Sequence, residues 1–173
     1  MKIKSDFVTN SSSSSFIVAF PKIVKTLHDV IDFIPTKYAE TVCNDAINQK
    51  PRMRKSEKLL RWIIKELDTG YPMYGNKECE VDAWDYDKVV RKREGVSDTG
   101  YVENHVWRRI IYDEVRLKRN SFNFQLAKQF LETVPNGHYI YRFSYADEDG
   151  EYFSEMEHGN IFRKLSSIQI SKH

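Results

Sequence analysis

The spacing of the apolar residues changes along this chain of 173 residues, and that change constrains the fold more than any other sequence feature. Through the middle of the chain, apolar side chains recur every three to four positions, which is the period of an amphipathic helix. From Tyr139 to Tyr145 they recur at every second position, which is the period of a strand with one buried face. The sequence therefore predicts an α+β protein with a small C-terminal antiparallel sheet.

Helical spacing of apolar residues predicts four or five helices before that sheet. Thr26 is a suitable N-terminal cap for the first helix and Pro35 ends it, whereas Ser121 is a suitable cap for the last helix. Residues 71–100 contain several glycines and are predicted to be rich in loops, with one further element within residues 81–90. The predicted helices cover residues 27–34, 36–48, 56–70, 102–118 and 122–131.

A hairpin is predicted near the C-terminus. The dipeptide Asp149-Gly150 suits a type I′ turn, because glycine adopts the positive φ that this turn requires. Tyr139–Tyr145 and Glu151–Glu157 are therefore predicted to pair as antiparallel strands on either side of it.

The chain is predicted to form one domain over residues 1–173, with residues 1–15 as a polar N-terminal lead. Phe16 to Phe20 is rich in β-branched and aromatic residues, which is typical of a buried strand. Ile168 and Ile170 indicate a last short strand. We expect the N-terminal strand to join the C-terminal sheet, so that the two ends of the chain meet.

Composition excludes several classes of protein. Charged residues make up 30% of the chain, and the apolar run from Phe16 to Pro21 falls far short of the roughly 20 residues of a membrane span. No apolar segment follows the basic start as a secretory signal would, and Cys43 and Cys79 form no paired pattern. We expect a cytoplasmic protein without disulfide, metal or cofactor, because a chain of this length can bury a core unaided.

Both ends of the chain resemble a loose set of bacterial and phage-borne proteins. The opening residues, Lys4 to Asn10 followed by Ser11 to Ser15 and Phe16 to Val18, resemble the start shared by this set. The closing stretch from Tyr145, with His158-Gly159 and the final Ile168 to His173, is similar to the tail of some members. The resemblance implies a bacterial or mobile-element origin. It implies no catalytic residue, since the set has no defined function to carry over.

Positive charge is densest around the start of the third predicted helix. This basic run lies within residues 50–61. Together with Arg91-Lys92-Arg93, Arg108-Arg109 and the aromatic residues between them, it would allow residues 50–119 to contact phosphates and stack bases. Acidic residues interleave with the basic ones, and the pI of about 8.4 lies below the value above 9 typical of nucleic-acid binders. The candidate nucleic-acid-binding residues are Lys50, Arg52, Arg54, Lys55, Lys58 and Arg61.

No motif for catalysis or metal binding stands out. Five histidines are present, and His158, which follows Ser154 by four positions, has only neighbouring carboxylates to orient it. Aligning Gly150 with the glycine of an EF-hand loop puts Tyr145 and Met156 at the two anchoring ligand positions, so calcium is not expected. A second acidic group lacks a ligand template as well, and consists of Glu78, Glu80, Asp82, Asp85 and Asp87.

The sequence therefore favours a non-catalytic module that binds another protein, with a regulatory or inhibitory role and no contact with membranes. A nucleic-acid-binding protein that uses the basic 50–119 region is the first alternative. A small hydrolase built from scattered histidines and carboxylates is the second. The sequence carries no signal for an oligomeric state.

Overall fold

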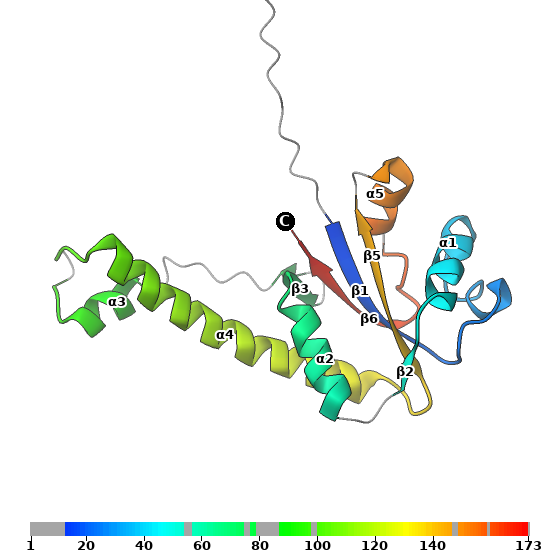
Figure 1. Ribbon diagram of the computed structural model, residues 1–173, viewed down its shortest axis with the longest axis horizontal. Coiled ribbons are helices and arrows are strands. Elements are labelled where there is room, and N and C mark those ends of the chain that lie inside the picture. Colours follow the sequence, from blue (N-terminus) through cyan, green and yellow to red (C-terminus); the bar gives the residue numbers. More distant parts are fainter. Residues whose placement is uncertain are drawn as a thin grey trace, which may run out of the picture.

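The computed structural model describes residues 13–53, 57–74, 77–78, 87–97, 100–146, 149–158 and 160–172 (Figure 1). These residues form a sheet with helices on both sides, so the predicted α+β class is confirmed. The elements, in chain order, are β1 (Ser13–Phe20), the 3-10 helix η1 (Leu27–Asp29), α1 (Thr36–Ile47), β2 (Arg52–Met53), α2 (Glu57–Leu67), β3 (Tyr71–Tyr74), β4 (Lys77–Glu78), α3 (Asp87–Glu94), α4 (Asn104–Thr133), β5 (Tyr139–Ala146), α5 (Glu151–His158) and β6 (Ser166–Ser171).

The strands form one sheet in the order β2-β5-β1-β6-β3-β4, and all neighbouring strands in it are antiparallel. The N-terminal strand β1 lies between the two C-terminal strands, with Ile17 opposite Arg142 on β5 and Ile168 on β6. The expectation that the two ends of the chain meet in one sheet is confirmed. The N-terminal strand β1 therefore pairs on both of its edges with strands from the C-terminal part of the chain.

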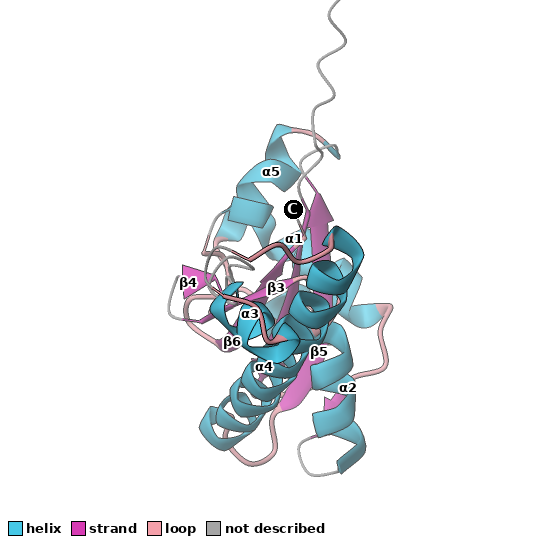
Figure 2. Ribbon diagram, turned by 90° about the vertical axis from the view of Figure 1, so that its left-hand side faces the viewer, coloured by secondary structure: helices cyan, strands magenta, loops and turns pink. Residues whose placement is uncertain are grey.

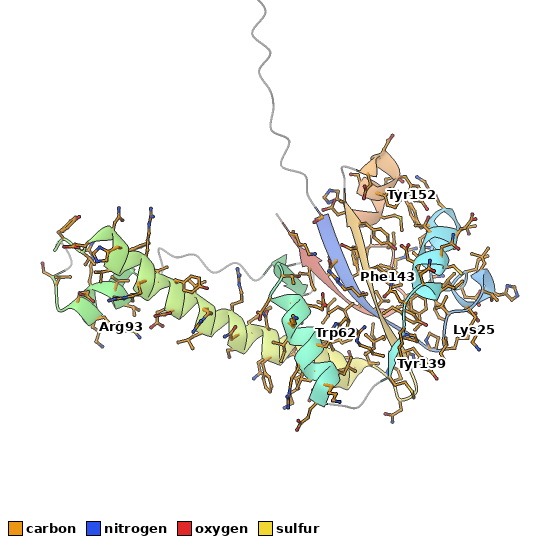
Figure 3. The ribbon with its side chains drawn as sticks, in the orientation of Figure 1. Lys25, Trp62, Arg93, Tyr139, Phe143 and Tyr152 are labelled. Atoms are coloured by element: carbon orange, nitrogen blue, oxygen red, sulfur yellow. The ribbon has the colours of Figure 1, made fainter. Side chains whose placement is uncertain are left out.

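Both faces of the sheet are covered, which explains the uninterrupted apolar run of β1. Phe16, Val18 and Phe20 point to an aromatic face, which is covered by α1, α5 and the turns over residues 30–34. Ile17 and Ala19 point to an aliphatic face, which is covered by α2 and the C-terminal half of α4. Figure 2 shows the strands enclosed between these helices, and Phe143 lies on the side toward α1 in Figure 3.

Helix α4 extends well beyond the sheet. Its 30 residues span about 45 Å, and only the C-terminal half packs on the aliphatic face, through Leu126, Ala127 and Phe130. The N-terminal half packs on α3 around a small separate core that includes Val90 and Ile110. We call α3 and residues 104–118 of α4 the arm, which Figure 1 shows reaching away from the sheet.

The prediction of two helices over residues 102–118 and 122–131 is wrong, because they form the single helix α4. The apolar pattern breaks near Ser121 since the helix changes its buried side, not because it ends. Ile110 faces α3 and Leu126 faces the sheet, and sixteen residues turn the helix by about 160° beyond whole turns. Ser121 is an exposed residue inside the helix and caps nothing.

The predicted hairpin at Asp149-Gly150 is also wrong, because residues 151–158 form helix α5. Gly150 has a φ of 110°, and its carbonyl accepts hydrogen bonds from the amides of Phe153 and Ser154 at 3.0 Å each. Met156 is fully buried against the aromatic face, where Tyr152 and Phe153 also pack. Strand β5 pairs with β1 instead, so the positive φ of Gly150 serves a helix start rather than a strand turn.

Residues 27–34 form the 3-10 helix η1 and further turns, not the predicted α-helix. Val30 and Ile34 are buried, whereas Leu27 is 44% exposed and Ile31 is 38% exposed. The carboxylate of Asp29 accepts the backbone amides of Lys25 and Thr26 at 2.9 Å each, which favours a tight turn. Pro35 then has extended backbone geometry, so no regular helix continues through it.

The remaining differences are small. Ser13, Ser14 and Ser15 belong to β1 rather than to a polar lead, since Ser14 and Ser15 are buried between neighbouring strands. The predicted helices over 36–48 and 56–70 are confirmed as α1 and α2, and the strands at 16–20, 139–145 and Ile168 to Ile170 are confirmed as β1, β5 and β6. Residues 1–12 and 79–86 lie outside the described part of the chain. None of the described helices combines the length and hydropathy that a bilayer span requires.

Candidate partner-binding site

A cavity of about 390 Å³ lies where the arm leaves the sheet, between the end of α2 and the middle of α4. This volume is typical of sites that hold a small ligand or the side chains of a partner. Its described lining consists of Asp68, Tyr112, Val115, Arg116, Arg119 and Asn120.

The sequence spacing of α4 places most of this lining on one side of the helix. Val115, Arg116 and Arg119 follow Tyr112 by three, four and seven positions, so their side chains lie on the same side of the helix as Tyr112. In the C-terminal half of α4 the same side packs against α2 and the sheet. In the arm this side reaches solvent, and Tyr112 is 66% exposed. The cavity therefore lies on the side of α4 that is buried against α2 and the sheet further along the helix.

A partly buried hydrogen bond lies beside the cavity and joins its two helices. The side-chain amide of Asn123 donates to the Asp68 carboxylate at 2.6 Å, and Asn123 is fully buried. Asp68 directly follows α2, and its backbone amide donates to the carbonyl of Ile64 at 3.1 Å. The sequence analysis missed both residues. The available signal was the polar Asn123 at the helical spacing of the buried residues Leu126 and Phe130.

The chemistry of the lining suits an anionic group. Two arginines and one aspartate line the cavity, and the Tyr112 hydroxyl and the Asn120 amide add neutral donors. A guanidinium binds a carboxylate or a phosphate through two parallel hydrogen bonds, which gives both affinity and orientation. Asp68 reduces the net positive charge of the site. A single carboxylate side chain therefore suits this cavity better than a dianion does.

The tip of the arm is held by ion pairs between α3 and α4. Arg93 lies 2.7 Å from Glu114, and the indole of Trp107 donates to Asp87 at 3.0 Å. Arg91 lies 2.7 Å from Asp87, and this guanidinium together with the Trp107 indole lowers the pKa of the Asp87 carboxyl. A second cavity of about 250 Å³ at this tip is lined in part by Asp87, Arg91 and Trp107. These contacts give the arm a defined shape without help from the sheet.

The described members of the predicted nucleic-acid-binding run lie toward the opposite end of α2 from the cavity. The guanidinium of Arg52 is 4.0 Å from the ring centre of Trp62, and Arg61 pairs with Glu57 at 2.9 Å. Lys50 and Lys58 are exposed, whereas Arg54 and Lys55 lie outside the described residues. Figure 3 shows Arg93 at the far end of the arm from Trp62, so the structure does not bring this run together with the basic residues of α3.

The candidate catalytic and metal-binding residues are not gathered into one site within the described chain. His158 ends α5, and its Nε2 atom is 3.9 Å from the buried carboxylate of Glu157. No group of three or more His, Cys, Asp or Glu residues that could hold an ion occurs among the residues described. His173, Asp147, Glu148, Glu80, Asp82 and Asp85 lie outside the described residues.

Comparisons with protein-family models, with curated proteins and with solved structures find no match to this chain.

Proposed function

We propose that this protein is a non-catalytic binding module that docks an acidic segment of a partner protein at the base of its arm. The observation that carries the proposal is the cavity that Tyr112, Arg116 and Arg119 line beside the end of α2. A carboxylate side chain of the partner would pair with the guanidinium groups, and the partner chain would continue along the open side of the arm.

The exposed residues of the arm support a protein partner. Tyr112 is 66% exposed, as is Tyr101 to 82% just before α4, and tyrosine is one of the residue types that contribute most to protein interfaces. Arginine is also enriched at such interfaces, and Arg108, Arg109 and Arg116 are exposed on α4. An arm held rigid by its own ion pairs loses little conformational entropy when it binds.

The lining of the cavity also supports binding over catalysis. Its described residues include one carboxylate, Asp68, and no histidine, so they do not supply an acid and a base for hydrolysis. The hydrolase alternative needs two or more such groups converging on one pocket. The cavity offers donors and an aromatic ring, which are the groups that hold a ligand in place.

Nucleic-acid binding is the second candidate, and one observation favours it. Arg108, Arg109, Arg116 and Arg119 follow the open side of α4 over about 16 Å, which would allow contacts to successive phosphates. Acidic residues lie close to this line, because Asp68 lines the cavity and Asp113 is exposed on the same helix. The run at Lys50, Arg52, Arg54, Lys55, Lys58 and Arg61 remains part of this second candidate.

Site-specific photo-crosslinking tests the proposed function. A photoreactive phenylalanine analogue at position 112 should capture a protein partner in the source cell, whereas the same analogue at Met53, which is 60% exposed on β2, should not. The purified partner should then bind the wild-type chain at least about tenfold more tightly than the Arg116→Glu variant, measured by calorimetry. Lys25→Glu, an exposed charge reversal away from the arm, is the matched control.

Equal capture at positions 112 and 53, or an affinity that Arg116→Glu leaves unchanged, would contradict the proposal. Fluorescence anisotropy with single-stranded and duplex oligonucleotides at about 0.15 M salt tests the second candidate. Micromolar binding that neutralisation of Arg52, Arg54 and Lys55 abolishes would favour the nucleic-acid reading.

A further inference from the structure

We infer that a second copy of this chain docks antiparallel on α4, with Leu117 of each copy packed against Phe124 of the other. The inference goes beyond the proposed function and does not depend on it. Leu117 lies about 140° around the helix from Tyr112, so the two surfaces lie on different sides of α4, with Asn120 at the border between them.

The docking surface is an apolar line on the outer side of α4. Leu117 is 59% exposed and Phe124 is 44% exposed, although both are large apolar residues. They are seven positions apart, which is close to two helical turns, so they lie one above the other about 10 Å apart. The partly buried Leu131 continues the line after another seven positions.

The charged residues at the two ends of this line are complementary when two copies of α4 pack antiparallel. Asp113 lies one turn before Leu117, and Lys128 lies one turn after Phe124. When Leu117 is placed opposite Phe124 of an antiparallel copy, Asp113 comes opposite Lys128 of that copy, and the contact occurs twice. A parallel pair in register would place Asp113 beside Asp113 and Lys128 beside Lys128. The charge pattern therefore selects the antiparallel arrangement.

The centre of the predicted contact is small and polar. The two-fold axis would pass between Asn120 and Ser121, which lie midway between Leu117 and Phe124. Both residues are exposed, and both carry a donor and an acceptor that can pair across the axis. Such self-complementarity is what an isologous two-fold interface requires, whereas an unrelated partner would not need it.

The existing ion pairs around the line are compatible with this contact. Lys128 lies 4.0 Å from Glu132, and both side chains are more than half exposed, so Lys128 can turn toward a partner. Glu114 already pairs with Arg93 at 2.7 Å, which leaves the exposed Asp113 as the acid that faces the second copy. One helix from each copy makes the contact, so we expect a dimer whose population depends on concentration.

Sedimentation equilibrium of the full chain between about 1 µM and about 1 mM tests this inference. The wild type should dimerise within this range, and Leu117→Glu and Phe124→Glu should each weaken the dimer at least about tenfold. Asp113→Lys and Lys128→Asp should each weaken it as well. The variant that carries both Asp113→Lys and Lys128→Asp should dimerise like the wild type, because each new lysine would face a new aspartate on the other copy. Gln129→Ala, an exposed change on another side of α4, should leave it unchanged.

A wild-type chain that stays monomeric throughout this range would overturn the inference. It would also be overturned by a dimer that Leu117→Glu leaves intact, or by a double charge swap that dimerises no better than either single variant. Circular dichroism of every variant separates loss of folding from loss of association, since all five substituted positions are exposed. Failure here leaves the proposed function standing, because that function is tested by partner binding at Arg116.

Discussion

The side-chain amide of Asn123 donates a 2.6 Å hydrogen bond to the carboxylate of Asp68, which joins the middle of α4 to the end of α2. Asn123 is fully buried whereas Asp68 is exposed, so this bond is shielded from water at its Asn123 end. It lies at the point where α4 leaves the sheet, and so it sets the position of the arm relative to α2 and the shape of the cavity between them.

Asn123→Ala should lower the free energy of unfolding by about 1–3 kcal/mol, because Asp68 loses a buried donor. Urea denaturation measures the change. The matched control is Gln129→Ala on the exposed side of the same helix, which should change stability by less than about 0.5 kcal/mol. Equal effects of the two substitutions would show that the hydrogen bond does not stabilise the junction.

Ser121→Ala should leave stability unchanged or raise it by up to about 0.5 kcal/mol, since alanine is the better residue inside an exposed helix. If Ser121 were instead the N-terminal cap of a separate helix, the same substitution would cost about 0.5–2 kcal/mol. The sign of the change in urea denaturation therefore distinguishes one continuous helix from two.

Gly70→Ala should destabilise the fold by about 1–3 kcal/mol, because it overfills a close backbone contact. A Cβ atom at Gly70 would lie 2.2 Å from the carbonyl oxygen of Ser171, which belongs to β6 and cannot move without disturbing the sheet. Gly137→Asn is the comparison, because nothing lies within 4 Å of a Cβ there and asparagine tolerates the φ of 83°. A larger loss at Gly137 than at Gly70 in thermal unfolding would contradict this account.

Asp29 should make stability depend on acid pH. Its carboxylate pairs with Lys22 at 2.8 Å and accepts the amides of Lys25 and Thr26, and these contacts hold its pKa well below the usual range. A lowered pKa in the folded state means that the stabilisation is present above the unfolded pKa of about 3.9 and is lost as the pH falls below it.

The melting temperatures of the wild type and of Asp29→Ala should therefore differ at neutral pH and converge as the pH falls below about 4. Asp29→Asn keeps an acceptor for the two amides but not the charge, so it should lie between them. A gap between wild type and Asp29→Ala that stays constant down to pH of about 2 would show that the charge of Asp29 contributes nothing.

The local parts of this fold could be predicted because they follow from short-range spacing. The aromatic residues from Tyr139 to Tyr145 occupy every second position, which places their side chains on one side of a strand whichever strand it pairs with. In the structure they line the aromatic face. The spacing of Leu59, Ile63 and Leu67 likewise defines the buried side of α2. Neither pattern depends on which other element supplies the covering surface.

The candidate site could not be predicted in the same way. Asp68 and Arg116 are far apart in the sequence, and only the packing of α2 on α4 brings them to one cavity. The basic run at Lys50 to Arg61 stood out because its charges are adjacent in the chain. The arginines of the cavity are spread along a helix, so their common direction became meaningful only once the open side of that helix was known.

The sequence by itself determined the class of fold, the sides of the main strands and helices, and the absence of long apolar runs, because each of these depends on neighbouring residues. Tertiary structure decided that β5 pairs with β1, that residues 151–158 form a helix and that α4 is one continuous helix. Gly150 suits a hairpin turn and a helix start equally well, and the two sides of α4 are each apolar over only half its length. In each case the local pattern allows two answers, and the burial of apolar surface against distant parts of the chain selects one.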